Sequence, residues 1–176
     1  MTYQYPPLEG HGWILRLLKL TPTDSGSINL SLVQRTLNDA NLSYEAVSYA
    51  WGSTIPDLEL GLSDGKTLLV TLSLLSGLNV WKTACSTGYL WIDQLCINQS
   101  DLEERNSQVA QMGRIYSGAT SVIVWLGHAS ETQVELIKEL VAVVGNDTDE
   151  AHLCGDNLMR RLEPMMEAIA PLIAYR

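Results

Sequence analysis

The sequence contains no phenylalanine, although it has 176 residues and 46% of them are hydrophobic. Its core must therefore be built from leucine, isoleucine, valine, tryptophan and tyrosine. Charged residues make up only 18% of the chain, a balance that predicts a compact fold and argues against disorder. This length is typical of one domain, so we expect residues 1–176 to form a single domain.

Basic residues are also scarce. The 11 lysines and arginines stand against 20 acidic residues, which gives a formal net charge of -9. An acidic surface repels the phosphates of nucleic acids and of anionic lipids. The basic residues are scattered, and only Arg160 and Arg161 are adjacent. The sequence therefore predicts a protein that does not bind nucleic acid.

Cysteine occurs only as Cys85, Cys96 and Cys154. Such a sparse, odd set favours free thiols in a reducing compartment. The N-terminus lacks the basic and apolar regions of a secretory signal, and no apolar run approaches the ~20 residues that cross a bilayer. We therefore expect a cytoplasmic protein without a membrane span. The cysteines and histidines also lack the CxxC or HxxxH spacing of a zinc site, so we predict no metal site.

Hydrophobic periodicity predicts alternating strands and helices from residue 44 onwards. Strands are expected over residues 14–20, 28–37, 44–52, 89–93 and 121–126, and helices over residues 72–84, 101–119, 131–144 and 158–175. The strand-helix order favours right-handed crossovers and a mainly parallel sheet flanked by helices, which is a three-layer α/β fold. The two N-terminal strands either extend this sheet or form a side layer.

Two segments carry more specific signals. Asp64-Gly65 is a typical two-residue turn, and it predicts a β-hairpin over residues 58–71, inserted after the first parallel strand. The run SVIVWL at residues 121–126 is apolar throughout, which predicts a strand covered on both faces.

Polar and aromatic residues follow three of the predicted parallel strands, which end SYAWG, WIDQLCINQ and WLGH. Ligands bind beyond the carboxyl ends of strands in an open parallel sheet, so we expect these three ends to meet around one site. A structural alternative stays open for each residue. The tryptophans also suit a core, Asn98 and Gln99 suit a turn, and Asp101 with Glu104 matches a helix capping box.

Two blocks, YEAVSYAWG at residues 44–52 and LWIDQLCINQSDLEERNSQVAQMGRIYSGATSVIVWLG at residues 90–127, resemble the fungal heterokaryon incompatibility (HET) domain. The motifs WID, CINQ, the Glu104-Arg105 pair and VIVWLG occur in the order of that family. On this resemblance residues 44–127 are the motif core, and residues 1–41 and 145–176 are variable flanks. The resemblance implies a role in non-self recognition and regulated cell death.

HET domains have been compared with TIR domains, which share a flavodoxin-like parallel sheet and some of which cleave NAD. On that likeness, residues 44–52 are similar to the first TIR strand, LWID to the second and SVIVWL to the third. The catalytic glutamate of TIR enzymes lies on the helix after the third strand, where this chain has Glu131, Glu135 and Glu139. The Trp-Cys pair that marks the TIR helix is absent here.

Cleavage of NAD at the nicotinamide-ribose bond passes through an oxocarbenium-like state, which a nearby carboxylate stabilises. The candidate catalytic residues are Asp93, Glu104 and Glu135. The reaction also needs aromatic rings for the base and polar groups for the ribose and phosphates. The candidate substrate-binding residues are Tyr49, Trp51, Gly52, Trp91, Cys96, Asn98, Gln99 and Arg105. The sequence has no Walker loop and no GxGxxG motif, so we predict no bound cofactor, and NAD enters only as a substrate.

Two alternatives to this hypothesis stay open. Cys96 with His128 is a candidate pair of thiol nucleophile and base, although a cysteine in an apolar run is also a common core residue. The domain is otherwise a signalling module that has no enzymatic activity and acts by self-association, as adaptor TIR domains do. Release of nicotinamide from NAD separates the enzymatic hypothesis from the second alternative.

Overall fold

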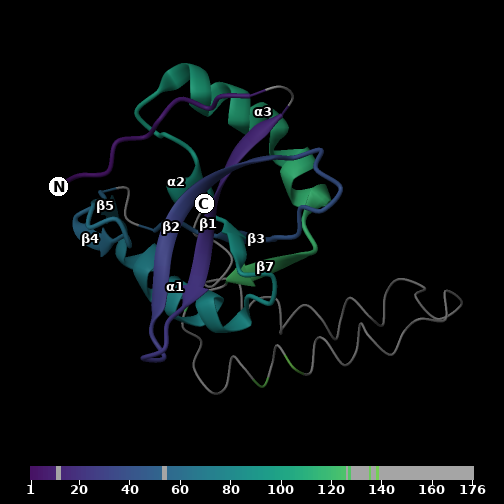
Figure 1. The fold of residues 1–176 in the computed structure, drawn as a ribbon. Helices are drawn as coiled ribbons and strands as arrows, with labels where there is room; N and C mark the ends of the chain where they lie inside the picture. Colours follow the sequence, from purple (N-terminus) through teal and green to yellow (C-terminus); the bar gives the residue numbers. More distant parts are fainter. Residues whose placement is uncertain (11–12, 53–54, 126, 128–134, 136–137, 139–176) are drawn as a thin grey trace, which may run out of the picture. The chain divides into compact units, whose positions relative to one another are not determined.

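The computed structural model describes residues 1–10, 13–52, 55–125, 127, 135 and 138. The chain divides into two compact units, Met1–Trp125 and Leu126–Arg176. The elements of the first unit are β1 (Ile14–Pro22), β2 (Ile28–Thr36), β3 (Glu45–Tyr49), β4 (Leu58–Gly61), β5 (Thr67–Val70), α1 (Leu72–Ala84), β6 (Tyr89–Trp91), α2 (Asp93–Cys96), α3 (Leu102–Gly118) and β7 (Ser121–Trp125) (Figure 1). The helices predicted over residues 131–144 and 158–175 lie outside the described residues, except for the helical positions Glu135 and Lys138.

Five strands form one mixed sheet in the order β2-β1-β6-β3-β7. β3 lies between β6 and β7 and runs parallel to both, which confirms that the three predicted strands lie side by side in the same direction. β1 runs antiparallel to both β2 and β6, so the N-terminal strands extend the sheet. The expectation of a mainly parallel sheet is therefore only partly right. The turn between β1 and β2 is too short for the crossover that parallel pairing needs.

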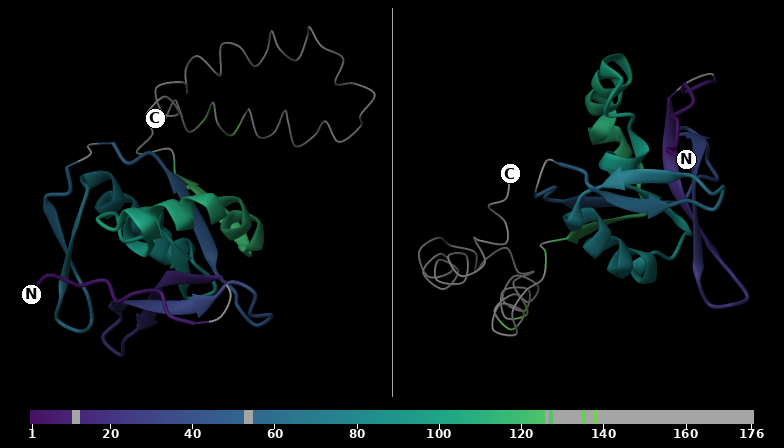
Figure 2. Two further views of the ribbon diagram at one scale, coloured as in Figure 1. Left: turned by 90° about the horizontal axis from the view of Figure 1, so that it is seen from above. Right: turned by 90° about the vertical axis from the view of Figure 1, so that its left-hand side faces the viewer.

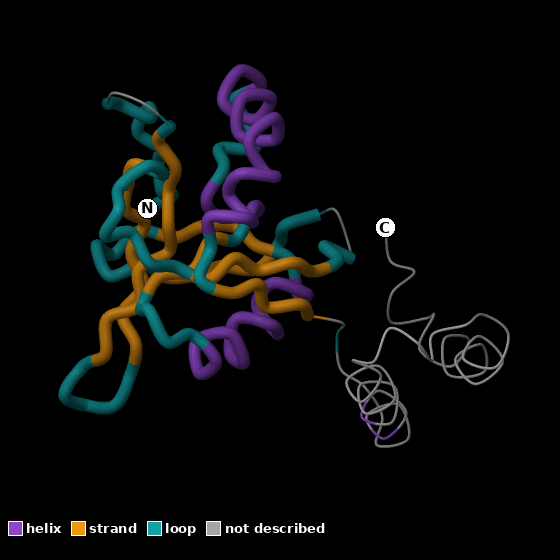
Figure 3. The backbone as a smooth tube through the Cα atoms, turned by 90° about the vertical axis from the view of Figure 1, so that its right-hand side faces the viewer, coloured by secondary structure: helices purple, strands orange, loops and turns teal. Residues whose placement is uncertain are grey.

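Helices cover both faces of the sheet (Figure 2, Figure 3). On one face Trp81 of α1 packs edge-on against Tyr49 and Trp125, with ring centroids 5.0 and 6.3 Å apart. On the other face Tyr116 of α3 packs against Trp91 at a centroid distance of 5.4 Å. Side chains alternate between the two faces of a strand, so these contacts fix the side on which each helix lies. The result is a three-layer arrangement, and the α/β class is confirmed.

The core replaces the missing phenylalanine with leucine and tryptophan. Trp81 and Trp91 are both 0% exposed, and twelve leucines of the first unit are buried with them: Leu15, Leu17, Leu18, Leu20, Leu30, Leu60, Leu62, Leu68, Leu74, Leu78, Leu90 and Leu95. Trp81 also lies against its own helix. A Cβ added at Gly77 would lie 2.2 Å from the Trp81 ring, so only glycine leaves room for this indole. No helix in the described part of the chain is long and apolar enough to cross a membrane.

The inserted hairpin forms a separate two-stranded sheet of β4 and β5. Its turn is longer than the two residues predicted from Asp64-Gly65. The Leu62 amide donates to the Lys66 carbonyl at 2.8 Å, and the Gly65 amide donates to the Leu62 carbonyl at 3.1 Å. Gly65 has a φ of +79°, in the left-handed region that favours glycine. The three residues between Leu62 and Lys66 therefore form the tip.

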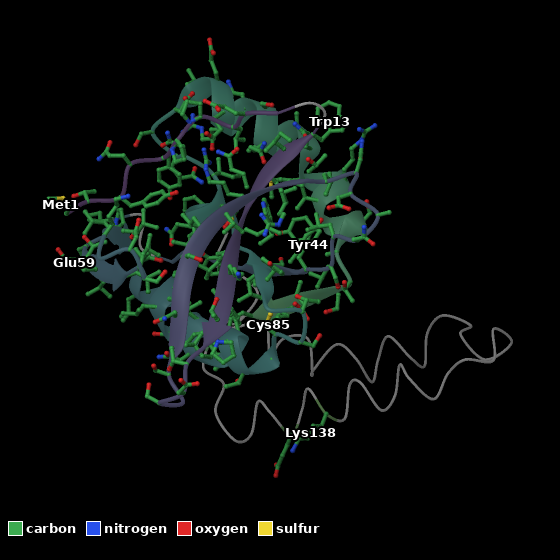
Figure 4. The ribbon with its side chains drawn as sticks, in the orientation of Figure 1. Met1, Trp13, Tyr44, Glu59, Cys85 and Lys138 are labelled. Atoms are coloured by element: carbon green, nitrogen blue, oxygen red, sulfur yellow. The ribbon has the colours of Figure 1, made fainter. Side chains whose placement is uncertain are left out.

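Residues 1–10, which we call the N-terminal segment, pair with this hairpin before they cross the first unit (Figure 1). The Tyr3 amide donates to the Thr67 carbonyl at 2.8 Å, and the Thr67 amide donates to the Met1 carbonyl at 2.9 Å. Figure 4 shows Met1 beside the hairpin, near Glu59 of β4. The segment is therefore an ordered part of the first unit, fastened to β5 by backbone hydrogen bonds.

β7 is the last strand of the five-stranded sheet in the described part of the chain. Val122 and Val124 point to one face and are 44% and 62% exposed. The prediction that this strand is covered on both faces is therefore wrong for the described residues. The reason is the position of α3, whose Tyr116 reaches Trp91 of β6 and the Val47 carbonyl of β3.

Candidate functional site

The ends of β3 and β6 bring Trp51 and Asp93 together. The Trp51 Nε1–H group donates to both carboxyl oxygens of Asp93, at 3.0 Å each. The Gln94 amide donates to Asp93 Oδ1 at 2.7 Å. Two of the three strand ends therefore meet, as parallel neighbours must. The third end falls on residues 126–128, of which only the exposed Gly127 is described.

Asp93 is the first residue of α2 and is half-buried. Burial raises the pKa of its carboxyl, and the hydrogen bonds from Trp51 and Gln94 counteract this only in part. A carboxyl with a raised pKa accepts a proton more strongly than an exposed aspartate does. Burial therefore makes the Asp93 carboxyl a stronger proton acceptor than an exposed aspartate.

Gln94 joins three elements behind this carboxyl. Its Oε1 atom accepts hydrogen bonds from the Tyr49 hydroxyl at 3.3 Å and from the Thr71 hydroxyl at 3.1 Å. Thr71 also caps α1 by accepting a hydrogen bond from the Leu74 amide. Burial, with the nearby Asp93 charge as a second cause, raises the pKa of Tyr49, which keeps its hydroxyl a neutral donor. These bonds fix the ends of β3 and β6 against the start of α1.

The loop after β3 carries Trp51 and Gly52. The Ser73 hydroxyl of α1 donates to the Ala50 carbonyl at 2.8 Å, which holds the loop just before the indole. Gly52 has a φ of +68°, so the glycine allows the chain to turn sharply after Trp51. The predicted role of Gly52 in binding a substrate stays a prediction.

A pocket of about 530 Å³ lies beside this cluster. Its size falls within the range of about 300–1,000 Å³ that is usual for small-molecule sites. Trp51, Asn98 and Gln99, three of the predicted substrate-binding residues, line it together with Gln94. The other walls are residues 2–5 of the N-terminal segment, Pro56, Ser100, and Leu68 and Leu69 of β5. Asp93 itself is not a lining residue, but its carboxyl is hydrogen-bonded to the Trp51 indole, which is.

Asn98 and Gln99 also hold the loop between α2 and α3. The Gln99 side-chain amide donates to the Asp93 carbonyl at 3.0 Å. Asn98 Oδ1 accepts a hydrogen bond from the Ser100 amide at 3.2 Å. Asn98 and Gln99 therefore stabilise the loop, as the structural alternative for them predicted, and they also line the pocket.

Glu104 forms an ion pair with Arg16 of β1. Arg16 Nη1 lies 2.5 Å from Glu104 Oε1, and Arg16 Nη2 lies 2.9 Å from Glu104 Oε2. Arg16 is only 1% exposed, and it also donates to the carbonyls of Cys96 and Pro6. The Asn98 amide donates to Glu104 Oε1 at 2.7 Å. Both oxygens of Glu104 are engaged and neither lines the pocket, so the geometry supports an anchoring role for this residue.

The capping box expected at the start of α3 forms only in one direction. Asp101 accepts hydrogen bonds from the Glu103 and Glu104 amides, each at 3.0 Å. The Asp101 amide donates to the Asn98 carbonyl and does not bond the Glu104 side chain. Glu104 is thereby available for Arg16, which lies 88 positions earlier in the chain.

Two predicted substrate-binding residues belong to the core instead. Trp91 is 0% exposed and packs against Tyr116, so neither ring face is open to a ligand. Cys96 is 1% exposed, and burial raises the pKa of its thiol to about 12. A buried thiol with such a pKa does not act as a nucleophile. Its proposed partner His128 lies outside the described residues.

Two further candidates are not among the residues that line the pocket. Arg105 is exposed on α3 and is not a lining residue. Glu135 is helical and exposed, and it belongs to the second unit. In the described part of the chain, no group of three or more histidine, cysteine, aspartate or glutamate side chains is placed to hold a metal ion.

The sequence interpretation missed Arg16 and the N-terminal segment. A basic residue within the apolar strand ILRLLKL was the available signal for a buried ion pair. No pattern in residues 1–10 indicated that Tyr3 and Tyr5 line a pocket. The segment was assigned to the variable flank, and its contacts to Thr67 and Leu95 are made across long sequence separations.

Glu45 forms a second polar cluster that the sequence interpretation also missed, at the start of β3. Its carboxylate accepts hydrogen bonds from the Ser86 amide at 2.8 Å and the Ser86 hydroxyl at 2.6 Å. The Thr87 hydroxyl and the Cys85 thiol donate to its other oxygen (Figure 4 labels Cys85). Burial alone would raise the pKa of Glu45, but the hydrogen bonds outweigh it and lower the pKa to about 2. The cluster fastens the loop between α1 and β6.

Comparison with known proteins identifies a family and a relative of this chain. Residues 44–169 match the family described as Heterokaryon incompatibility protein (HET). Heterokaryon incompatibility protein 6, OR allele, of Neurospora crassa is 33% identical over 148 residues, an alignment that covers 72% of this chain and 22% of that protein. The chain thus spans less than a quarter of the length of this relative. No solved structure matches.

Proposed function

The chain belongs to the heterokaryon incompatibility (HET) family, and from this membership we propose that it serves fungal non-self recognition and cell death by hydrolysing NAD or a related nucleotide. One observation carries the enzymatic part of the proposal. The buried carboxyl of Asp93, with its raised pKa, is hydrogen-bonded to an indole that lines a pocket of ligand size. Perturbed carboxyls beside a pocket are typical of catalytic sites.

The strand order supports the likeness to TIR domains. The parallel strands lie in the order β6-β3-β7, so the first along the chain lies between the second and the third. Flavodoxin-like sheets begin with this order, and they bind ligands at the carboxyl ends of these strands. The pocket residues Trp51 and Gln94 follow two of these ends.

In the proposed reaction a water molecule attacks the anomeric carbon of the ribose. The carbon–nitrogen bond breaks, and its electron pair passes to the nicotinamide nitrogen, which becomes neutral. The Asp93 carboxylate takes the proton from the water and stabilises the oxocarbenium-like state. The hydrogen bonds from Trp51 Nε1 to Asp93 must open for this step, because they occupy both carboxyl oxygens.

Nicotinamide release from NAD tests the proposal. The 176-residue chain is incubated with NAD at high protein concentration, and nicotinamide is followed by chromatography. Asp93→Asn keeps an acceptor for the Trp51 indole but removes the base, so we expect at least a 100-fold loss of rate with an unchanged melting temperature. The wild-type chain releasing no nicotinamide, or an Asp93→Asn variant that is fully active, would overturn the enzymatic proposal.

A signalling module that acts by self-association is the second candidate. The exposed valines of β7 favour it, because an end strand with apolar side chains is a template for pairing with another chain. Light scattering over a range of concentrations tests it. We expect Val124→Lys to abolish any concentration-dependent mass increase, and Val109→Lys on α3, which is 53% exposed in the native chain, to leave it unchanged. A mass that stays monomeric at all concentrations rules this candidate out.

A further inference from the structure

The pocket beside Trp51 has an unusual charge distribution for a nucleotide site. None of the described residues that line it carries a charge. Its walls consist of aromatic rings, aliphatic side chains, hydroxyls and four side-chain amides, which are those of Gln4, Gln94, Asn98 and Gln99. Sites that hold phosphate normally offer arginine, lysine or a helix N-terminus with open amide groups.

Two cationic side chains lie against the tyrosine rings of the pocket, and both already have an acidic partner. The Arg16 guanidinium lies 5.0 Å from the centre of the Tyr5 ring, behind the pocket wall, and pairs with Glu104. Lys66 Nζ lies 5.7 Å from the Tyr3 ring centre and 2.9 Å from Asp64 Oδ2. A phosphate in the pocket would therefore find both of these side-chain cations already paired, in a chain whose formal net charge is -9.

The aromatic rings of the pocket are held in place from several directions. Tyr3 and Tyr5 lie perpendicular with ring centroids 5.1 Å apart. The Tyr5 hydroxyl donates to the Leu95 carbonyl at 3.0 Å, and its ring rests on Arg16. Trp51 is held by the carboxyl of Asp93. Rings that are fixed before binding give up little freedom when a flat ligand stacks on them.

The amides complete the recognition surface. Gln94 uses its oxygen for Tyr49 and Thr71, so its side-chain N–H groups are the part that serves as a donor. Gln99 uses a side-chain N–H group for the Asp93 carbonyl, so its oxygen is an acceptor. Donors and acceptors beside aromatic rings are what an uncharged base or sugar requires.

We propose that this pocket takes one nucleoside end of its ligand, the base with its ribose, and leaves phosphates outside, and that Tyr3 and Tyr5 decide which ring is accepted. The choice of a nucleoside among flat polar ligands rests on the proposed function. The two tyrosines lie outside residues 44–169, the region that matches the family, so this wall belongs to the part of the chain that the family match leaves out. A dinucleotide would enter with one nucleoside end.

Titration with adenosine and AMP tests the proposal, with calorimetry as the readout. We expect adenosine to bind at least as tightly as AMP, and both affinities to change less than twofold between low and high salt. Binding of AMP more than tenfold tighter than adenosine would show a phosphate site and overturn the proposal. Absence of binding for both compounds would overturn it as well.

Two substitutions place a lysine at matched exposed positions. Leu69 lines the pocket and is 53% exposed, whereas Val80 of α1 does not line it and is 43% exposed. We expect Leu69→Lys to raise the affinity for AMP relative to adenosine by about tenfold, and Val80→Lys to leave the ratio unchanged. Equal ratios for the two variants would contradict the position of the ligand in this pocket.

Tyr3→Leu tests the wall that the N-terminal segment provides. Tyr3 is half-buried, and leucine retains apolar bulk while it removes the ring. We expect adenosine to bind at least tenfold more weakly, because stacking on an aromatic ring is lost. An unchanged affinity would refute the role of this residue. Adenosine binding without nicotinamide release from NAD would support this inference and refute hydrolysis. Nicotinamide release that is insensitive to Tyr3→Leu and Leu69→Lys would support hydrolysis and refute this inference.

Discussion

The Glu104 carboxylate holds the Arg16 guanidinium in a two-point ion pair that is almost closed to solvent, with side-chain exposures of 9% and 1%. Glu104 lies in the first turn of α3, and Arg16 lies in β1, so the pair fastens the helix to the antiparallel side of the sheet. The same carboxylate accepts the Asn98 amide, which positions the loop that forms one wall of the pocket. A residue of the HET motif thus acts on the pocket through the backbone it holds.

Glu104→Gln should destabilise the fold strongly, because it leaves the buried Arg16 charge without its partner. Breaking one side of a buried pair typically costs about 3–5 kcal/mol. Chemical denaturation provides the measurement. The double variant Arg16→Met, Glu104→Met should recover much of this loss, since no uncompensated charge remains. A Glu104→Gln chain that unfolds within about 1 kcal/mol of wild type would contradict the anchoring role.

Glu45 should make the protein sensitive to acid. The pKa of Glu45 in the folded state, about 2, lies below the value of 4.5 that a glutamate has in the unfolded chain. Its contribution to stability is therefore fully present above pH 4.5 and is lost as the pH falls towards 2. The shift corresponds to a contribution on the order of 3 kcal/mol. Glu45→Gln should be less stable at pH 7 and lose less stability between pH 5 and 2, as measured by thermal unfolding. Parallel pH profiles for the two proteins would contradict this.

Trp51→Phe should raise the pKa of Asp93 further. The phenyl ring keeps much of the apolar cover, but it removes the N–H group that bonds both carboxyl oxygens and lowers the pKa. Carboxyl NMR signals recorded over a range of pH provide the measurement, with Asp93→Asn used for assignment. Because the folded pKa of Asp93 is already raised, its ionisation opposes folding as the pH rises, and this effect should grow in Trp51→Phe. A pKa that falls in the variant would contradict the hydrogen-bond account.

Local patterns predicted the elements well, because each depends on nearby residues. The helix expected over residues 72–84 and the strands at each parallel strand position are present. Asp101 caps α3 as its spacing predicted. The meeting of Trp51 and Asp93 also followed from the sequence, since parallel neighbours must end at the same edge of the sheet.

Contacts between distant residues were beyond the sequence. Trp51 and Trp91 both lie next to a polar segment at the end of a strand. Only the fold shows that Trp51 lines a pocket and that Trp91 lies in the core. Arg16 finds Glu104 across 88 positions, and Tyr5 finds Leu95 across 90. Such pairings depend on how strands and helices assemble, which no local spacing encodes. The antiparallel pairing of β1 with β6 escaped prediction for the same reason.

Gly77 and Gly113 provide a matched test of the packing that holds the site. Both lie within helices, so alanine should favour the helix at each by about 0.5–1 kcal/mol. A Cβ at Gly113 meets nothing within 4 Å, and Gly113→Ala should therefore raise the melting temperature. At Gly77 the same Cβ would lie 2.2 Å from the buried Trp81 ring.

Gly77→Ala should accordingly lower the melting temperature, because overpacking of a core typically costs about 1–3 kcal/mol and outweighs the gain in helix propensity. The displaced indole would also press on Tyr49, which it contacts edge-on and which bonds Gln94 beside the pocket. The variant should therefore bind a pocket ligand more weakly, whereas Gly113→Ala should not. If both alanines stabilise the chain equally, Trp81 has room to move, and its packing does not hold the end of β3 in place.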